Sequence, residues 1–165
     1  MKYSLATLNQ MEKEAFSEAL GHIFEHSPHI AAATSEKRPF TSLNDLHYQL
    51  MATVRSLPLE EQDTLIKQHP DLATKAQMAD ASVQEQTAAG LNTLTPDEYN
   101  RFQELNQAYR AQFGFPFIIA VRNHNKASIL DAFVHRLENS LEKERASAID
   151  EISKIAYFRL LDVVE

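Results

Sequence analysis

A histidine, a carboxylate and a long apolar segment are the parts of this sequence best suited to chemistry. His69 stands directly before a proline, Glu85 lies in the polar segment 82–86, and residues 113–121 are almost all apolar. Proton transfer in a water-poor pocket requires such a set, because burial favours the uncharged forms of a histidine and a carboxyl group and strengthens hydrogen bonds to a substrate. The combination therefore predicts a site for acid–base chemistry.

Pro70 predicts where the helix before His69 ends. A proline disfavours the α conformation in the residue before it, so a helix that starts after Pro58 should end near His69. The macrodipole at a helix C-terminus favours the imidazolium form by a few tenths to about 1 kcal/mol for an exposed ring. We therefore expect the His69 ring to hold a proton near neutral pH.

Ser82 and Glu85 have the spacing of a helix N-cap. A serine followed three residues later by a glutamate satisfies two backbone N–H groups at a helix start, which is a purely structural interpretation. The same placement suits a site, because the remaining N–H groups of a helix N-terminus can hold an anion or a carbonyl. The two interpretations are compatible.

Arg159 lies on the apolar side of the last predicted helix, four residues after Ile155 and seven after Ile152. A guanidinium group in that position needs a partner. It either reaches solvent, forms an internal ion pair, or binds a substrate carboxylate through two parallel hydrogen bonds.

Residues 115–121 have the composition of a strand, but the sequence offers no second strand to pair with them. We expect buried extended backbone. Such a segment either fills core between helices or uses its unpaired peptide groups to bind a planar ligand rich in amides.

Three histidines near the N-terminus suggest a competing chemistry. The spacing of His22, His26 and His29 can place two imidazoles on one helix face, as in some metal sites. No second motif and no cysteine supports a metal there, so we expect no bound metal. The competing hypothesis, a histidine-ligated metal hydrolase, predicts bound metal and chelator-sensitive activity.

Composition favours a single all-α domain. The 165 residues, 44% of them hydrophobic, suffice for one core, which predicts one domain over residues 1–165. Only 3 glycines and 6 prolines argue against many tight turns, whereas long stretches of Ala, Leu, Glu, Lys and Gln favour helices. Gly114 is expected to end one of them. Periodicity predicts about seven or eight helices, with starts near Asn9 with Glu12, Ser42, Pro58, Ser82, Thr95, Lys126 and Asn139 with Glu142.

Charge and cysteine content narrow the function classes. With 16 Lys and Arg against 23 Asp and Glu, the net charge of -7 opposes binding to nucleic acid or an acidic membrane surface. No apolar stretch reaches the roughly 18 residues of a membrane span, residues 1–5 lack a signal-peptide core, and residues 163–165 form no peroxisomal signal. The absence of cysteine excludes disulfides and thiolate chemistry and agrees with a reducing compartment, so we expect a cytoplasmic location.

Five motifs follow one another along nearly the whole chain. They are HPDLA at 69–73, SxxEQxxAGL at 82–91, LNxxY at 105–109, FGFPFI at 113–118 and IAxxRL at 155–160. Together they resemble the 2-oxo-4-hydroxy-4-carboxy-5-ureidoimidazoline (OHCU) decarboxylase family. Ala73 and Asn123 depart from the family pattern, because many relatives have glycine there, and these departures affect the expected loop geometry.

The resemblance implies a cofactor-free, all-helical enzyme of uric acid degradation. It would be a carboxy-lyase that converts OHCU into (S)-allantoin and carbon dioxide, and it would form a homodimer. His69 matches the catalytic histidine, and we expect Glu85 to act with it on the substrate. Arg159 would bind either the substrate carboxylate or the ureido carbonyl. The residues that match substrate contacts are Pro70, Ser82, Glu85, Gln86, the backbone of Phe117, Ile118, Ile119, Ala120 and Val121, and Arg159.

An alternative of a different class is a helical interaction module without enzymatic activity. In that case Ser82 and Glu85 only cap a helix, and Arg159 only forms an ion pair. The phenylalanine-rich segment would then bind a partner.

Overall fold

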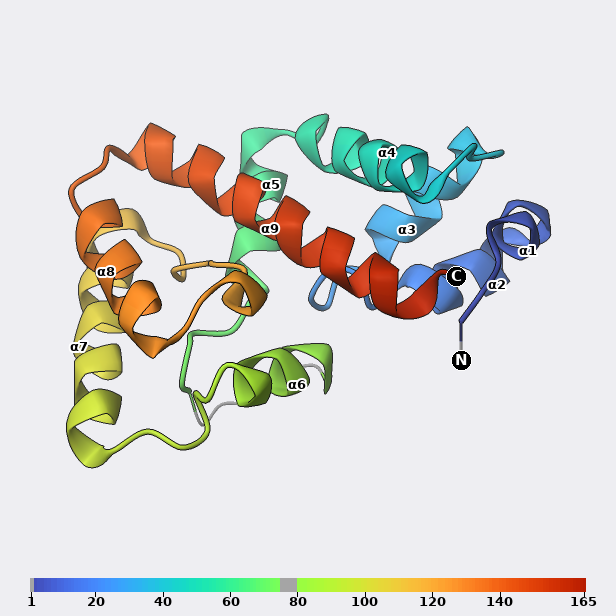
Figure 1. The fold of residues 1–165 in the computed structure, drawn as a ribbon. Coiled ribbons are helices and arrows are strands. Elements are labelled where there is room, and N and C mark those ends of the chain that lie inside the picture. Colours follow the sequence, from blue (N-terminus) through green and yellow to red (C-terminus); the bar gives the residue numbers. More distant parts are fainter. Residues whose placement is uncertain (1, 75–79) are drawn as a thin grey trace. The chain divides into compact units, whose positions relative to one another are not determined.

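The computed structural model describes residues 2–74 and 80–165, and the regular elements of this part of the chain are helices (Figure 1). Its nearest approach to a strand is an isolated parallel bridge between Tyr3 and Val164. The all-α prediction is therefore confirmed. The described residues form nine α-helices, and two of these, α1 and α3, have only six residues each, too few for a periodic apolar pattern to reveal them.

The helices follow the chain from α1 to α9, with two short 3-10 helices, η1 and η2. Their bounds are α1 Leu5–Gln10, α2 Lys13–Leu20, α3 His29–Thr34, η1 Ser35–Lys37, α4 Leu43–Arg55, α5 Leu59–Lys67, α6 Asp80–Ala88, α7 Pro96–Phe113, η2 Val121–Asn123, α8 Lys126–Arg136 and α9 Leu141–Val163. In the part of the chain described, no helix is both long and apolar enough to cross a membrane.

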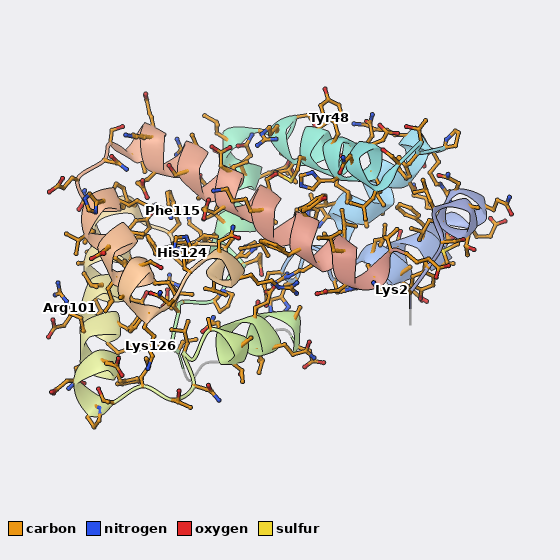
Figure 2. The ribbon with its side chains drawn as sticks, in the orientation of Figure 1. Lys2, Tyr48, Arg101, Phe115, His124 and Lys126 are labelled. Carbon is orange, nitrogen blue, oxygen red and sulfur yellow. The ribbon has the colours of Figure 1, made fainter. Side chains whose placement is uncertain are left out.

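The chain divides into two compact units, one of Met1–Leu65 with Ser153–Glu165 and one of Ile66–Ile152. In the first unit, Ser42 caps α4 by accepting a hydrogen bond from the backbone N–H of Asp45 at 2.9 Å, as its sequence predicts. Leu46 and Leu50 of that helix are fully buried, whereas Tyr48 is 68% exposed and projects from α4 (Figure 2). The amphipathic pattern of α4 thus gives the first unit part of its core.

The second unit contains α6, α7, η2 and α8. Thr95 and Glu98 form the predicted capping box of α7, and Gly114, with φ 81°, ends this helix in the left-handed conformation. Helices α7 and α8 lie side by side (Figure 1). Phe102 of α7 and Phe133 of α8 meet edge to face, with ring centroids 6.3 Å apart, in the core of the unit.

Two of the predicted capping residues are wrong because the polar side chain has another partner. Asn9 does not cap a helix with Glu12: it lies inside α1, where its amide donates to the carbonyl of Phe40 at 2.9 Å and accepts from the Phe40 N–H at 2.7 Å. Asn139 donates to Glu144 at 2.8 Å, and Ser140 accepts from the N–H of Lys143 at the start of α9.

Candidate active site

Helix α6 carries three of the predicted site residues on one buried face. Ser82, Glu85 and Gln86 are 5%, 8% and 6% exposed, and their spacing of three and four residues places them on the same side of the helix. Ser82 lies inside α6 and is not its N-cap, because Asp80 and Ala81 precede it within the helix. The capping interpretation of Ser82 is therefore wrong.

A glycine fixes the other end of α6. Gly90 has φ 83° and donates to the carbonyl of Thr87 at 3.0 Å, while the N–H of buried Leu91 donates to the carbonyl of Gln86 at 2.9 Å. This pair of bonds is the Schellman ending of a helix. The AGL sequence at 89–91 thus stops the helix one turn after its polar face.

His69 lies in a buried turn just after α5. Its N–H donates to the carbonyl of Ile66 at 3.1 Å, and the residue is only 5% exposed. The helix ends before Pro70 as predicted, but the ring is not the exposed one for which we expected a dipole-stabilised proton. A buried imidazole in this turn can exchange protons with a bound molecule out of contact with bulk water.

The backbone after His69 is tied to α6 and α7 by amide side chains. Gln86 accepts from the N–H of Ala73 at 3.0 Å, Asn106 donates to the carbonyl of Leu72 at 2.9 Å, and Gln103 donates to the carbonyl of Ala73 at 3.2 Å. Gln86 therefore joins the histidine turn to the face of α6 that carries Glu85. The family resemblance indicated Gln86 only as a substrate contact.

Ala73 adopts a backbone conformation that suits glycine. Its φ is 56°, which costs an L-residue roughly 1–2 kcal/mol, more than the 0.4–1 kcal/mol that glycine loses through its freer unfolded chain. We expect Ala73→Gly to raise the free energy of unfolding by about 0.5–1 kcal/mol, measured from urea denaturation. The matched control, Ala108→Gly on the exposed side of α7, should lower it by about the same amount. A loss of stability in Ala73→Gly would contradict the strain assigned to this turn.

Residues 115–120 form a buried segment outside any helix and, among the described residues, without a partner strand, whereas Val121, expected to belong to it, begins η2. Side chains bind its peptide groups instead: Arg136 donates to the carbonyl of Ile118 at 2.5 Å, and the N–H of Ala120 donates to Glu151 at 3.1 Å. The peptide groups of Ile119, between these two, have no hydrogen-bond partner in the described residues. A buried peptide group in this state suits a ligand that donates and accepts hydrogen bonds.

A buried polar cluster supports this segment. Glu144 is fully buried and accepts from the hydroxyl of Tyr109 at 2.6 Å, from Arg136 at 2.8 Å and from Asn139 at 2.8 Å. Burial, and then the hydrogen bond to Glu144, raises the pKa of Tyr109, so its hydroxyl stays a donor. The guanidinium of Arg136 also lies over the ring of Phe117, 4.3 Å from its centroid.

Glu85 has a cationic neighbour that the sequence patterns did not indicate. Nη2 of Arg122 lies 3.9 Å from Oε2 of Glu85, with the two side chains 32% and 8% exposed. Arg122 belongs to η2, which follows the extended segment directly and packs on α6. The second unit therefore brings the Glu85 face, the segment 117–121 and Arg122 together.

Arg159 belongs to the first unit, on the part of α9 that starts at Ser153. It is 3% exposed, with Nη2 3.4 Å from Oε2 of the buried Glu25 and Nη1 donating to the carbonyl of Ile23 at 3.2 Å. The internal ion pair considered from the sequence is therefore present. Burial, and then the charge of Arg159, lowers the pKa of the nearby His22.

The three N-terminal histidines do not share a helix face. Helix α2 ends at Leu20, His22 and His26 follow in the connection, and His29 begins α3. Within the described ranges, no group of three or more His, Asp or Glu side chains is arranged to hold a metal ion. The spacing argument for a metal site at these histidines is therefore wrong.

A pocket of about 500 Å³ lies beside α6 in the second unit. Of the predicted site residues only Gln86 lines it, and its other walls are uncharged. They are Ala73, Thr74, Val83, Thr87, Leu91, Asn92, Leu94, Pro96, Tyr99 and Asn100.

Comparisons with known proteins bear on the family. The OHCU decarboxylase profile matches residues 9–161. The 2-oxo-4-hydroxy-4-carboxy-5-ureidoimidazoline decarboxylase of Halalkalicoccus jeotgali is 39% identical over 159 residues, which are 96% of this chain and 90% of that protein.

Two further similar proteins are longer. The uric acid degradation bifunctional protein PucL of Bacillus subtilis is 45% identical over 162 residues. These residues are 98% of this chain but only 33% of PucL, so this chain spans about a third of that protein's length. The crystal structure of (S)-allantoin synthase matches with a TM-score of 0.80 and 30% identity, over 97% of this chain and 54% of that one. From the profile match and the relative of similar length, this chain belongs to the OHCU decarboxylase family.

Proposed function

We propose that this chain decarboxylates OHCU to (S)-allantoin and carbon dioxide, a step of uric acid degradation. The observation that carries the proposal is the joined pair of elements in the second unit, where Gln86 links the turn of His69 to the buried face of Glu85. This is the histidine and carboxylate set that the family motifs place at 69–73 and 82–91. The decarboxylase name of the relative of similar length supports the same reaction.

The reaction needs no cofactor because the substrate supplies its own electron sink. The carbon that loses carbon dioxide stands beside a C=N bond, which accepts the electron pair of the breaking C–C bond. The nitrogen of that bond takes up one proton, and the resulting enol then loses its hydroxyl proton and gains one proton on the neighbouring carbon. The protein has to stabilise the developing charge and deliver that proton to one face.

In the proposed mechanism Glu85 and His69 have separate roles in proton transfer. Glu85 contacts the substrate hydroxyl, and His69 exchanges the proton that sets the stereocentre. Pro70, Ser82 and Gln86 contact the substrate, as does the backbone of Phe117, Ile118, Ile119, Ala120 and Val121. Among these five, the peptide groups of Phe117 and Ile119 are the best suited to the amide-rich ring, since no described residue bonds them.

The test of this function is the stereochemistry of the product. Urate is oxidised and ring-opened by the upstream enzymes, and circular dichroism follows the allantoin formed with and without this protein. We expect a rapid signal from the (S) enantiomer. Racemic allantoin at the uncatalysed rate would overturn the proposal and favour the non-enzymatic interaction module.

Arg159 is the proposed substrate-binding arginine, and Arg159→Lys tests the assignment. We expect kcat/KM to fall about 10- to 100-fold, because lysine lacks the planar fork that bonds a carboxylate or carbonyl at two points. The matched control is Arg101→Lys, whose exposed ion pair with Glu104 should leave the kinetics unchanged. Thermal melting separates this loss from damage to the Glu25 pair. Unchanged kinetics would remove Arg159 from the substrate contacts.

Three broader features belong to the same proposal. Residues 1–165 act as one OHCU decarboxylase-like domain, which the profile match over 9–161 supports. The chain forms a homodimer and acts on a small-molecule substrate, as the resemblance implies. Its cysteine-free sequence favours work in the cytoplasm.

A further inference from the structure

The carboxylate of Glu85 is buried, and burial of a charged group requires compensation from its surroundings. Its side chain is 8% exposed, and the guanidinium of Arg122 lies 3.9 Å from Oε2. At that separation Nη2 of Arg122 attracts the carboxylate through charge and makes no hydrogen bond to this oxygen. This contact therefore contributes to the electrostatic compensation of the buried carboxylate of Glu85.

The position of Arg122 is fixed by the same backbone that forms the extended segment. Arg122 is the second residue of η2, which is closed by hydrogen bonds from Asn123 to Ala120 and from His124 to Val121, each 3.0 Å long. The N–H of Ala120 is in turn held by Glu151. Because η2 packs on α6, a shift of the segment moves Arg122 relative to Glu85.

We propose that Arg122 is a positioning residue of the decarboxylation, which keeps the buried carboxylate of Glu85 oriented toward the substrate. The inference rests on the proposed function. In this role Arg122 links the two parts of the site in the second unit, so that the carboxylate on α6 and the peptide groups of 117–121 keep one relative geometry. A misplacement of a reacting group by about 1 Å can cost roughly 100-fold in rate.

The test is a double-mutant cycle between Arg122 and Glu85. We expect Arg122→Gln to lower kcat about 10- to 100-fold with a smaller change in KM, since it alters the group that reacts more than the groups that bind. Arg122→Lys, which keeps the positive charge beside Glu85, should restore most of kcat. In a Glu85→Gln background, Arg122→Gln should have no further effect on the residual rate.

Two controls make the result decisive. Arg101→Gln removes an exposed arginine of α7 (Figure 2) and should leave kcat unchanged. Thermal melting of each variant reports whether it is folded. If the wild-type enzyme is active and Arg122→Gln leaves its kcat unchanged, the role of Arg122 is overturned while the proposed function stands. The same holds if Arg122→Gln lowers kcat by the same factor in the wild-type protein and in Glu85→Gln. An inactive wild-type protein would overturn the proposed function, and with it this inference.

Discussion

Replacement of His69 by asparagine is expected to lower kcat about 100- to 10,000-fold, the range by which a positioned acid–base group accelerates a reaction. Asparagine keeps a polar group of similar size in the turn but cannot carry the proton that the carbon must gain. The hydrogen bond from the His69 N–H to Ile66 is a backbone bond and survives the change. The loss should therefore appear in turnover and not in stability, with kcat followed by circular dichroism of the allantoin.

The matched control for this variant is another histidine of the second unit. His135 is exposed on α8, and its ring bonds the carbonyl of Asp131 in the same helix at 2.8 Å. His135→Asn should retain full turnover. Full turnover in His69→Asn as well, with (S)-allantoin as product, would refute the catalytic role of His69 and assign the proton to another group.

The parts of the fold that the sequence predicted are those determined by neighbouring residues. The start of α7 follows from Thr95 and Glu98, whose side chains bond backbone within one turn, and its end follows from the φ that Gly114 adopts. Asn9 has an equally good local pattern, yet its amide bonds Phe40, 31 residues away. A local sequence pattern cannot reveal a partner so distant in the chain. This tertiary contact explains why the predicted helix start at Asn9 is wrong.

In the candidate site, too, the features set by local sequence could be predicted and those set by distant residues could not. His69 and Glu85 could be singled out from residue type and context, whereas Arg122 was missed because its pairing with Glu85 joins positions 37 residues apart. The sequence position of Glu144, by contrast, did indicate a buried charge. It stands four residues before Ala148 and eight before Ile152, on the apolar side of α9, where a carboxylate requires buried partners just as Arg159 does.

Replacement of Glu144 by alanine is expected to have the largest effect on stability, about 3–5 kcal/mol of the free energy of unfolding. Glu144 is fully buried and accepts hydrogen bonds from Tyr109, Arg136 and Asn139. Its removal leaves three donors without their acceptor and the cation of Arg136 without its carboxylate, although Nη2 of Arg136 already has no hydrogen-bond partner in the described residues. Urea denaturation measures the loss.

Two comparisons separate the buried charge from simple loss of packing. Glu104→Ala removes the carboxylate of an exposed ion pair with Arg101 and should leave the urea midpoint nearly unchanged. The double variant Glu144→Leu with Arg136→Met should be more stable than Glu144→Leu alone, because it removes the unpaired cation together with its partner. It should nevertheless lose activity, since Arg136 no longer holds the carbonyl of Ile118 and the peptide groups of 117–121 lose their fixed position. A double variant that is stable and fully active would mean that the extended segment keeps its geometry without this cluster.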